Sequence, residues 1–80
     1  MRLPRDAGGD DLIDRFARYG YRATRQTGSH VRLTRRTEDG EQHLTIPRHK
    51  PLKIGTLNHI LAQAAEQLRM DKQELIEQLF

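Results

Sequence analysis

The sequence predicts an α+β fold, with one three-stranded antiparallel sheet and helices packed on one of its faces. Apolar residues recur with a helical period near both ends of the chain and with a period of two in the middle. The chain has 80 residues, which suffice for a single small core. Cysteine is absent, so neither a disulfide framework nor a thiolate zinc site supports the fold. Packing alone must hold this domain together.

The first helix is predicted to begin near Asp10 and Asp11, which stand where a helix cap belongs. An apolar stripe follows at helical spacing, made of Leu12, Ile13 and Phe16. Gly20 is the expected left-handed stop of this helix. Residues 1–9 are expected to form a flexible tail, and residues 10–80 a single domain.

The middle of the chain predicts a three-stranded meander. Apolar side chains alternate with polar ones in two runs, which contain Val31, Leu33, Leu44 and Ile46. These runs form a hairpin around the turn at residues 38–40. Residues 21–25 form a shorter strand that joins the hairpin through the turn at residues 27–29. Pro47 ends the last strand, because proline has no N–H to donate to a neighbour.

A second helix is predicted from Gly55 and Thr56 onward and is prolonged as far as Met70. One of its faces is apolar and contains Leu57, Ile60, Leu61, Ala64 and Leu68. Asp71 with Glu74 then resembles a capping box and introduces a short third helix. The apolar residues of this last helix have two interpretations. They complete a thin core, or they form a surface for a partner or for a second copy in a homodimer.

One face of the predicted sheet stays open to solvent, because the helices cover only the other. The alternation places two histidines, an arginine and two threonines on this open face: His30, Arg32, Thr34, His43 and Thr45. The net charge is +3, and residues 1–36 hold nine arginines against four aspartates. The planar guanidinium fork suits phosphate, so the sequence indicates a polyanionic partner. A merely solvated basic face is the alternative.

Four short segments recur in a specific order along the chain. They are Gly20-Tyr21, RQTGSH at residues 25–30, IPRH at residues 46–49, and KIGTL at residues 53–57 followed by Ile60-Leu61. This pattern resembles that of HicA-type toxins, also called the YcfA family, over about residues 10 to 65. The resemblance implies a fold similar to the double-stranded-RNA-binding domain (dsRBD-like, α-β-β-β-α with a short C-terminal helix added). It also implies a ribonuclease that cleaves mRNA without metal or cofactor, and a HicB-type antitoxin as partner.

His30, in the Gly-Ser-His motif, is the catalytic residue that the resemblance implies. RNA can be cut without a metal through its own 2′-OH, provided that a base takes the proton and donors stabilise the phosphorane. A histidine suits proton transfer near neutral pH. RNA contacts are expected from Arg25, Gly28, Ser29, Arg32, Arg48, Lys53 and Thr56. His49 is a candidate second acid or base, or else a loop histidine bonded to local backbone.

Other chemistries fit the residues poorly. A metal site is not expected, because no HxxxH motif and no pair of a histidine with a carboxylate occurs at helical spacing. A Ser-His-acid hydrolase is excluded, because the adjacent Ser29 and His30 point to opposite faces of a strand. His43 and His59 are expected to be solvated. The apolar runs are too short to span a membrane and the first residues do not resemble a signal peptide, so a cytoplasmic location is expected.

Two further hypotheses remain open from the sequence. The first is a non-catalytic RNA-binding module, which needs the basic face but not His30. The second is a chain that serves mainly as the docking half of a toxin-antitoxin repressor complex.

Overall fold

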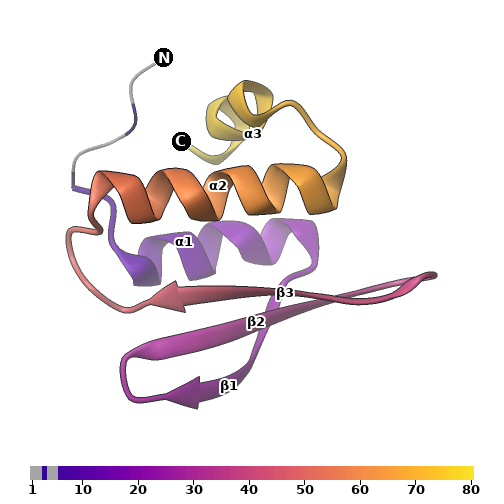
Figure 1. The fold of residues 1–80 in the computed structure, drawn as a ribbon, viewed down its shortest axis with the longest axis horizontal. Helices are drawn as coiled ribbons and strands as arrows, with labels where there is room; N and C mark the ends of the chain where they lie inside the picture. The colour runs from indigo at the N-terminus through magenta and orange to yellow at the C-terminus, as the bar shows by residue number, and fades with distance from the viewer. Residues whose placement is uncertain (1–2, 4–5) are drawn as a thin grey trace.

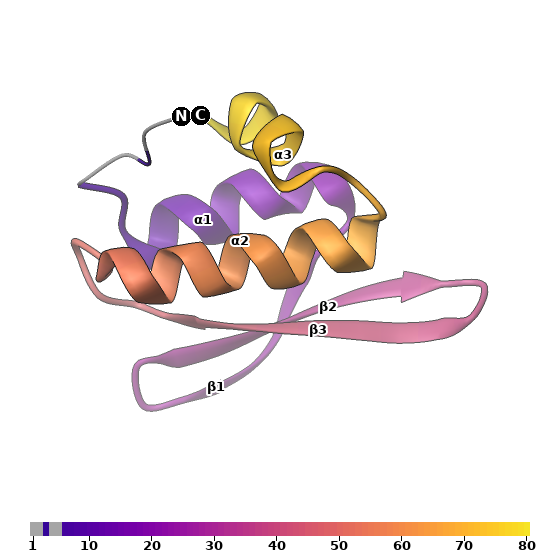
Figure 2. The same ribbon diagram turned by 45° about the horizontal axis from the view of Figure 1, so that its top comes forward.

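The computed structural model of the protein describes residue 3 and residues 6–80. In chain order the elements are α1 (Gly9–Phe16), the short 3-10 helix η1 (Ala17–Tyr19), β1 (Arg22–Thr27), β2 (His30–Thr37), β3 (Gly40–Pro47), α2 (Ile54–Leu68) and α3 (Lys72–Leu79). The strands form one antiparallel sheet in the order β1-β2-β3. Helices α1 and α2 lie side by side on one face of this sheet, and α3 lies beyond them (Figures 1 and 2). The predicted α+β fold with helices on one face of a three-stranded sheet is confirmed.

Strands β2 and β3 pair along their whole length, and their register confirms the predicted alternation. Val31 lies opposite Ile46, and Leu33 lies opposite Leu44. All four side chains are buried against the helices. On these two strands the other set of alternating side chains therefore faces away from the helices, which leaves one side of the sheet open.

Thr34 departs from the prediction for the open face. The alternation places it there, yet only 8% of its surface is exposed. Its hydroxyl contacts the Thr24 hydroxyl at 2.7 Å and Nδ1 of His43 at 3.0 Å, from the strands on either side. These neighbours cover a short side chain that the period of two predicts to be solvated.

Strand β1 is an edge strand, and all six of its residues are exposed. It begins at Arg22 and continues to Thr27, beyond the end predicted from the sequence. Its pairing with β2 shifts between Ala23 and Arg25, so that Thr24 forms a bulge. Four of its side chains, those of Arg22, Thr24, Arg25 and Thr27, line hollows on the open face.

The core lies between the sheet and the helices, and α3 completes it. Its largest fully buried side chains are Leu12, Phe16, Tyr21, Leu33, Leu44, Ile46, Leu57, Leu61, Leu75 and Leu79. From α3, Leu75, Ile76 and Leu79 are buried in this same cluster, whereas Phe80 is 39% exposed. The interpretation in which the last helix belongs to the core therefore holds for these three residues.

The start of α1 differs from the prediction. The cap is Gly8 instead of Asp10 or Asp11, and the Asp11 carboxylate accepts a hydrogen bond from the Gly8 N–H at 3.0 Å. The two aspartates thus lie in the first turn, where they complement the helix dipole. Within the predicted tail, Ala7, Gly8 and Gly9 are buried, while residues 1–2 and 4–5 lie outside the described residues.

The other helix ends lie close to their predicted places. Gly20 adopts the left-handed conformation expected of it, with φ at 90°. Helix α2 begins at Ile54 and ends at Leu68, before the predicted Met70, because Arg69 turns left-handed with φ at 55°. Asp71 caps α3 as predicted, and its carboxylate accepts the backbone N–H of Gln73 at 3.3 Å.

Within the described part of the chain, no helix is both long enough and apolar enough to cross a membrane.

Candidate nucleic-acid interface

His30 opens β2, immediately after the turn formed by Gly28 and Ser29. Gly28 has φ at 59°, a left-handed conformation that glycine adopts without strain. Apart from its chain neighbours, no atom lies within 4 Å of where its Cβ would be, so the space beside Gly28 is open. The exposed His30 side chain therefore begins the open face two residues after an unobstructed backbone position.

A hollow of about 570 Å³ surrounds His30. Three histidines, two arginines and three uncharged polar residues line it: His30, His43, His59, Arg25, Arg32, Thr27, Thr45 and Gln63. The structure thus brings Arg25 and Arg32, two residues expected to bind RNA, to the same hollow as His30. His59 and Gln63 reach it from α2, so the hollow continues past the sheet to the helix layer.

Arg25 and Arg32 lie directly opposite each other on β1 and β2. Like charges in this position destabilise a sheet. Neither arginine takes part in an ion pair with an acidic group among the described residues. The hollow around His30 therefore carries positive charge that nothing in the described chain neutralises, which suits a bound anion.

Ser29 connects the turn before His30 to the segment after β3. Its hydroxyl lies 3.3 Å from Nε2 of His49, and its carbonyl accepts the backbone N–H of Arg48 at 2.7 Å. The His49 ring is therefore paired with a side chain of the Gly-Ser-His motif and not with local backbone. His49 does not line the hollow around His30.

The Arg48 guanidinium points to α1. Its Nε donates to the Asp10 carboxylate at 2.8 Å, and a second nitrogen does so at 3.3 Å. This hydrogen-bonded ion pair raises the pKa of Arg48 above its already high ordinary value. Much of the Arg48 charge is thus already neutralised within the protein.

Lys53 and Thr56 lie at the beginning of α2. Lys53 caps the helix with its backbone and is exposed, and Thr56, in the first turn, is half-buried. Neither lines the hollow around His30. Of the seven predicted RNA-binding residues, Arg25 and Arg32 line the hollow and Lys53 and Thr56 lie at this helix start. The other three do neither, since Gly28 and Ser29 form the turn before His30 and Arg48 pairs with Asp10.

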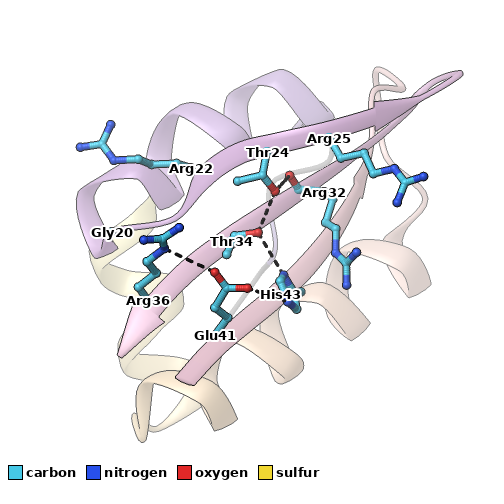
Figure 3. A pocket seen from close by; sticks show the side chains of 9 residues that line it. All are labelled: Gly20, Arg22, Thr24, Arg25, Arg32, Thr34, Arg36, Glu41 and His43. Carbon is cyan, nitrogen blue, oxygen red and sulfur yellow. Dashed lines mark hydrogen bonds and ion pairs between the residues drawn. The ribbon is translucent and has the colours of Figure 1, made fainter. Parts of the chain in front are cut away.

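A second hollow, of about 720 Å³, continues along the open face and is seen in Figure 3. It is lined by Gly20, Arg22, Thr24, Arg25, Arg32, Thr34, Arg36, Glu41 and His43. Arg25, Arg32 and His43 belong to both hollows. The open face thus forms one continuous basic surface in which His30 occupies one end.

Most residues that line the hollows were not predicted as functional, among them His43, His59 and Gln63. His43 was expected to be solvated, yet it is half-buried and hydrogen-bonded to Thr34. The alternation places both residues on the open face, so the sequence could have suggested this contact. His59 and Gln63 stand four apart, off the apolar stripe of α2, and so share one helix face. Nothing in the sequence indicates that this helix face adjoins the hollow around His30.

Among the described residues, no group of three or more histidine, aspartate or glutamate side chains is placed to hold a metal ion.

Comparison with known families gives one match. A family model described as "HicA toxin of bacterial toxin-antitoxin" matches residues 9–65, which extend from the start of α1 into the last turns of α2. This range contains every residue of both hollows, while α3 lies outside it. No curated protein and no solved structure matches the chain.

Proposed function

The chain belongs to the HicA toxin family of bacterial toxin-antitoxin systems, and from this premise we propose that it is an endoribonuclease toxin that cleaves mRNA with His30 as its catalytic histidine. One observation carries the proposal: His30 shares its hollow with Arg25 and Arg32, whose charges are uncompensated among the described residues. A titratable group beside two guanidinium groups can supply the proton transfer and the charge stabilisation that assist cleavage of a phosphodiester. A HicB-type antitoxin is the partner proposed to block this site.

The proposed reaction uses the RNA as its own nucleophile. His30 accepts the proton of a ribose 2′-OH, and the 2′-oxygen attacks the neighbouring phosphorus. The bond from phosphorus to the 5′-oxygen then breaks, which leaves a 2′,3′-cyclic phosphate and a 5′-hydroxyl whose proton comes from water. Arg25 and Arg32 stabilise the additional negative charge on the phosphorane oxygens. Because the nucleophile comes from the substrate, the proposed chemistry needs no metal ion and no cofactor.

The remaining predicted contacts extend the RNA site around this centre. The open turn at Gly28 lets RNA backbone approach His30, and the Ser29 hydroxyl can donate a hydrogen bond beside it. Lys53 and Thr56 mark the start of α2, whose free backbone N–H groups favour a phosphate. Arg48 contributes less than the other arginines, because Asp10 already holds its guanidinium.

The test is a His30→Ala variant, with His30→Asn beside it to keep a polar group of similar size. Purified protein is mixed with RNA, and the same variants are expressed in cells whose growth is followed. We expect cleavage to fall by about 100-fold or more, the usual contribution of a general acid or base, and growth arrest to be lost. Cleavage at the wild-type rate by His30→Ala would remove His30 from the catalytic role.

A non-catalytic RNA-binding module is the second candidate, and the basic surface favours it independently of His30. In that case the wild-type protein binds RNA, with an affinity that falls steeply as salt rises, but it leaves the strand intact. Cleavage by the wild-type protein therefore separates the two candidates. Binding that is insensitive to salt would argue against the arginines as the RNA site.

A further inference from the structure

We propose that the second hollow is a subsite for another phosphate of the bound RNA strand, and that His43 is its positioning residue and tightens binding when it is protonated. The inference rests on the proposed function in one respect, since it takes the ligand to be a strand of RNA that extends from His30. It goes further in assigning a separate site and a separate histidine.

The charge of the second hollow indicates an anion. Four arginines line it, and Glu41 is the only acidic residue that does so in the described part of the chain. Arg36 pairs with Glu41, Nε to Oε2 at 3.3 Å, with both side chains largely exposed to water. The other arginines are left without this acid, so the hollow keeps an excess of positive charge.

A chain of hydrogen bonds orients His43 in this hollow (Figure 3). The Thr24 hydroxyl lies 3.4 Å from the Arg32 carbonyl oxygen and 2.7 Å from the Thr34 hydroxyl. The Thr34 hydroxyl in turn lies 3.0 Å from Nδ1 of His43. These contacts hold the Nδ1 edge of the ring and leave Nε2 for a ligand.

The protonated form of His43 has a defined donor for a ligand. It carries a hydrogen on both ring nitrogens, so Nδ1–H donates to Thr34 and Nε2–H remains. Nε2 lies 3.9 Å from Oε1 of Glu41, beyond hydrogen-bond distance. The protonated ring therefore offers an N–H at the edge of the hollow, from which a phosphate oxygen can accept a hydrogen bond.

The groups around His43 come from all the elements that border its two hollows. Glu41 lies on its own strand, Thr34, Arg32 and Arg36 on β2, Thr24, Arg22 and Arg25 on β1, and His59 on α2. A phosphate in the hollow is attracted by the arginines and by a protonated His43 ring alike, so that binding of the anion and of the proton support each other.

His43 is too far along the sheet to act on the same phosphate as His30. His43 lies opposite Thr34, four residues beyond His30 on β2, which is about 13 Å at the usual rise of a strand. Side chains stand roughly perpendicular to a sheet, so the two rings keep a comparable separation. Arg32 lies between them on the same face, and the strand of RNA would pass over it from one hollow to the other.

The first test measures binding without cleavage. A 2′-O-methyl RNA oligonucleotide, which lacks the nucleophile, is titrated with the protein between about pH 5 and 8 at fixed ionic strength, the range in which histidines change charge. His43→Asn keeps an amide donor for Thr34 but has no Nε2. His59→Asn is the matched control, since His59 lines only the hollow around His30.

We expect the affinity of the wild-type protein for the oligonucleotide to rise as the pH falls. In His43→Asn this rise should be smaller by a factor of about ten, and in His59→Asn the reduction should be less. An unchanged pH dependence in His43→Asn would overturn the proposal. So would weaker wild-type binding at low pH, because Nε2 would then act as an acceptor, for example from a base.

A second pair of variants keeps the proposal testable if His43→Asn folds poorly. Glu41→Gln removes the acid from the hollow, and Glu38→Gln removes an exposed acid from the neighbouring turn. We expect Glu41→Gln to bind the oligonucleotide more tightly than Glu38→Gln does. Equal affinities would contradict an anion subsite at this place.

Cleavage of substrates of different length separates this inference from the proposed function. His43→Asn should raise KM more for a hexanucleotide, which reaches the second hollow, than for a dinucleotide, which fills only the hollow around His30. An equal rise for both lengths would contradict the subsite. If no protein cleaves either substrate, the proposed function fails, while the binding experiment still decides the subsite.

Discussion

The hydroxyl of Ser29 lies 3.3 Å from Nε2 of His49, a contact between residues twenty positions apart. The His49 carbonyl in turn accepts the backbone N–H of Gly9 at 2.9 Å. The start of α1, the segment after β3 and the turn that precedes His30 are thereby joined. The position of His30, the proposed catalytic histidine, thus depends on contacts between these three segments.

The pair of Ser29 and His49 predicts a graded response to substitution. His49→Ala should lower RNA cleavage about tenfold, the effect of one hydrogen bond, because the turn before His30 loses an anchor. His49→Gln can still bond to Ser29 and should keep most of the activity. Cleavage rates of both variants, beside Ser29→Ala, are the measurement. A loss in His49→Gln as large as in His49→Ala would instead support proton transfer by His49.

Gly9 should tolerate no side chain. A Cβ there would lie 1.9 Å from the Pro47 carbonyl oxygen and 2.9 Å from Cα of Arg48, and both are backbone atoms. Gly9→Ala should therefore lower the free energy of unfolding by about 1–3 kcal/mol, the cost of overpacking. Gly55→Ala is the control, since nothing lies within 4 Å of its Cβ position. At this position in the first turn of α2, alanine should stabilise the protein by about 0.4–1 kcal/mol, as urea unfolding can measure.

Tyr21 should make the protein less stable in alkali. Burial raises the pKa of its phenol above the ordinary value of 10.0, against a smaller opposite effect of Arg35. The unfolded chain therefore loses this proton first. The resulting stability is fully present below about pH 10 and is lost as the pH rises toward the higher pKa of the folded state.

The variant Tyr21→Phe tests this dependence. It should remove the alkaline loss of stability that Tyr21 causes. At neutral pH it should lower the free energy of unfolding by about 1 kcal/mol, because the phenol donates a hydrogen bond to Oε1 of Gln67 at 2.6 Å. Tyr19→Phe controls for the loss of a tyrosine, and should retain the alkaline loss. Unfolding measured from about pH 8 to 11 provides the comparison. If the stability of Tyr21→Phe falls in alkali as much as that of the wild-type protein, another group causes the fall.

Leu75 should be essential to the stability of the whole domain. It is fully buried, so Leu75→Ala should cost about 2–5 kcal/mol of the free energy of unfolding. Small domains hold about 5 kcal/mol or little more, so the variant should be largely unfolded at 37 °C. Ile54→Ala is a control at a position that is 49% exposed, and it should have a small effect on thermal unfolding. A stable, cooperative Leu75→Ala protein would show that α3 contributes little.

Much of this protein was determined by local pattern. The alternation around Val31 and Leu44 predicted the covered and open faces of the sheet, since side chains of a strand necessarily point to opposite sides. The apolar stripe containing Leu57 and Leu61 predicted the buried face of α2 in the same way. Four short segments in a specific order further indicated the family, and the Gly-Ser-His motif among them pointed to His30.

Only the tertiary structure decided which side chains meet. The Thr24 hydroxyl covers Thr34 through a bulge, and His59 joins the hollow around His30 because α2 lies against β3. Ser29 contacts His49 because the turn before β2 and the segment after β3 lie side by side. Periodicity depends on neighbours a few residues apart and therefore predicts which face a residue occupies. Contacts between residues far apart depend on how all the layers pack, so the shape and the charge of both hollows arise from the fold.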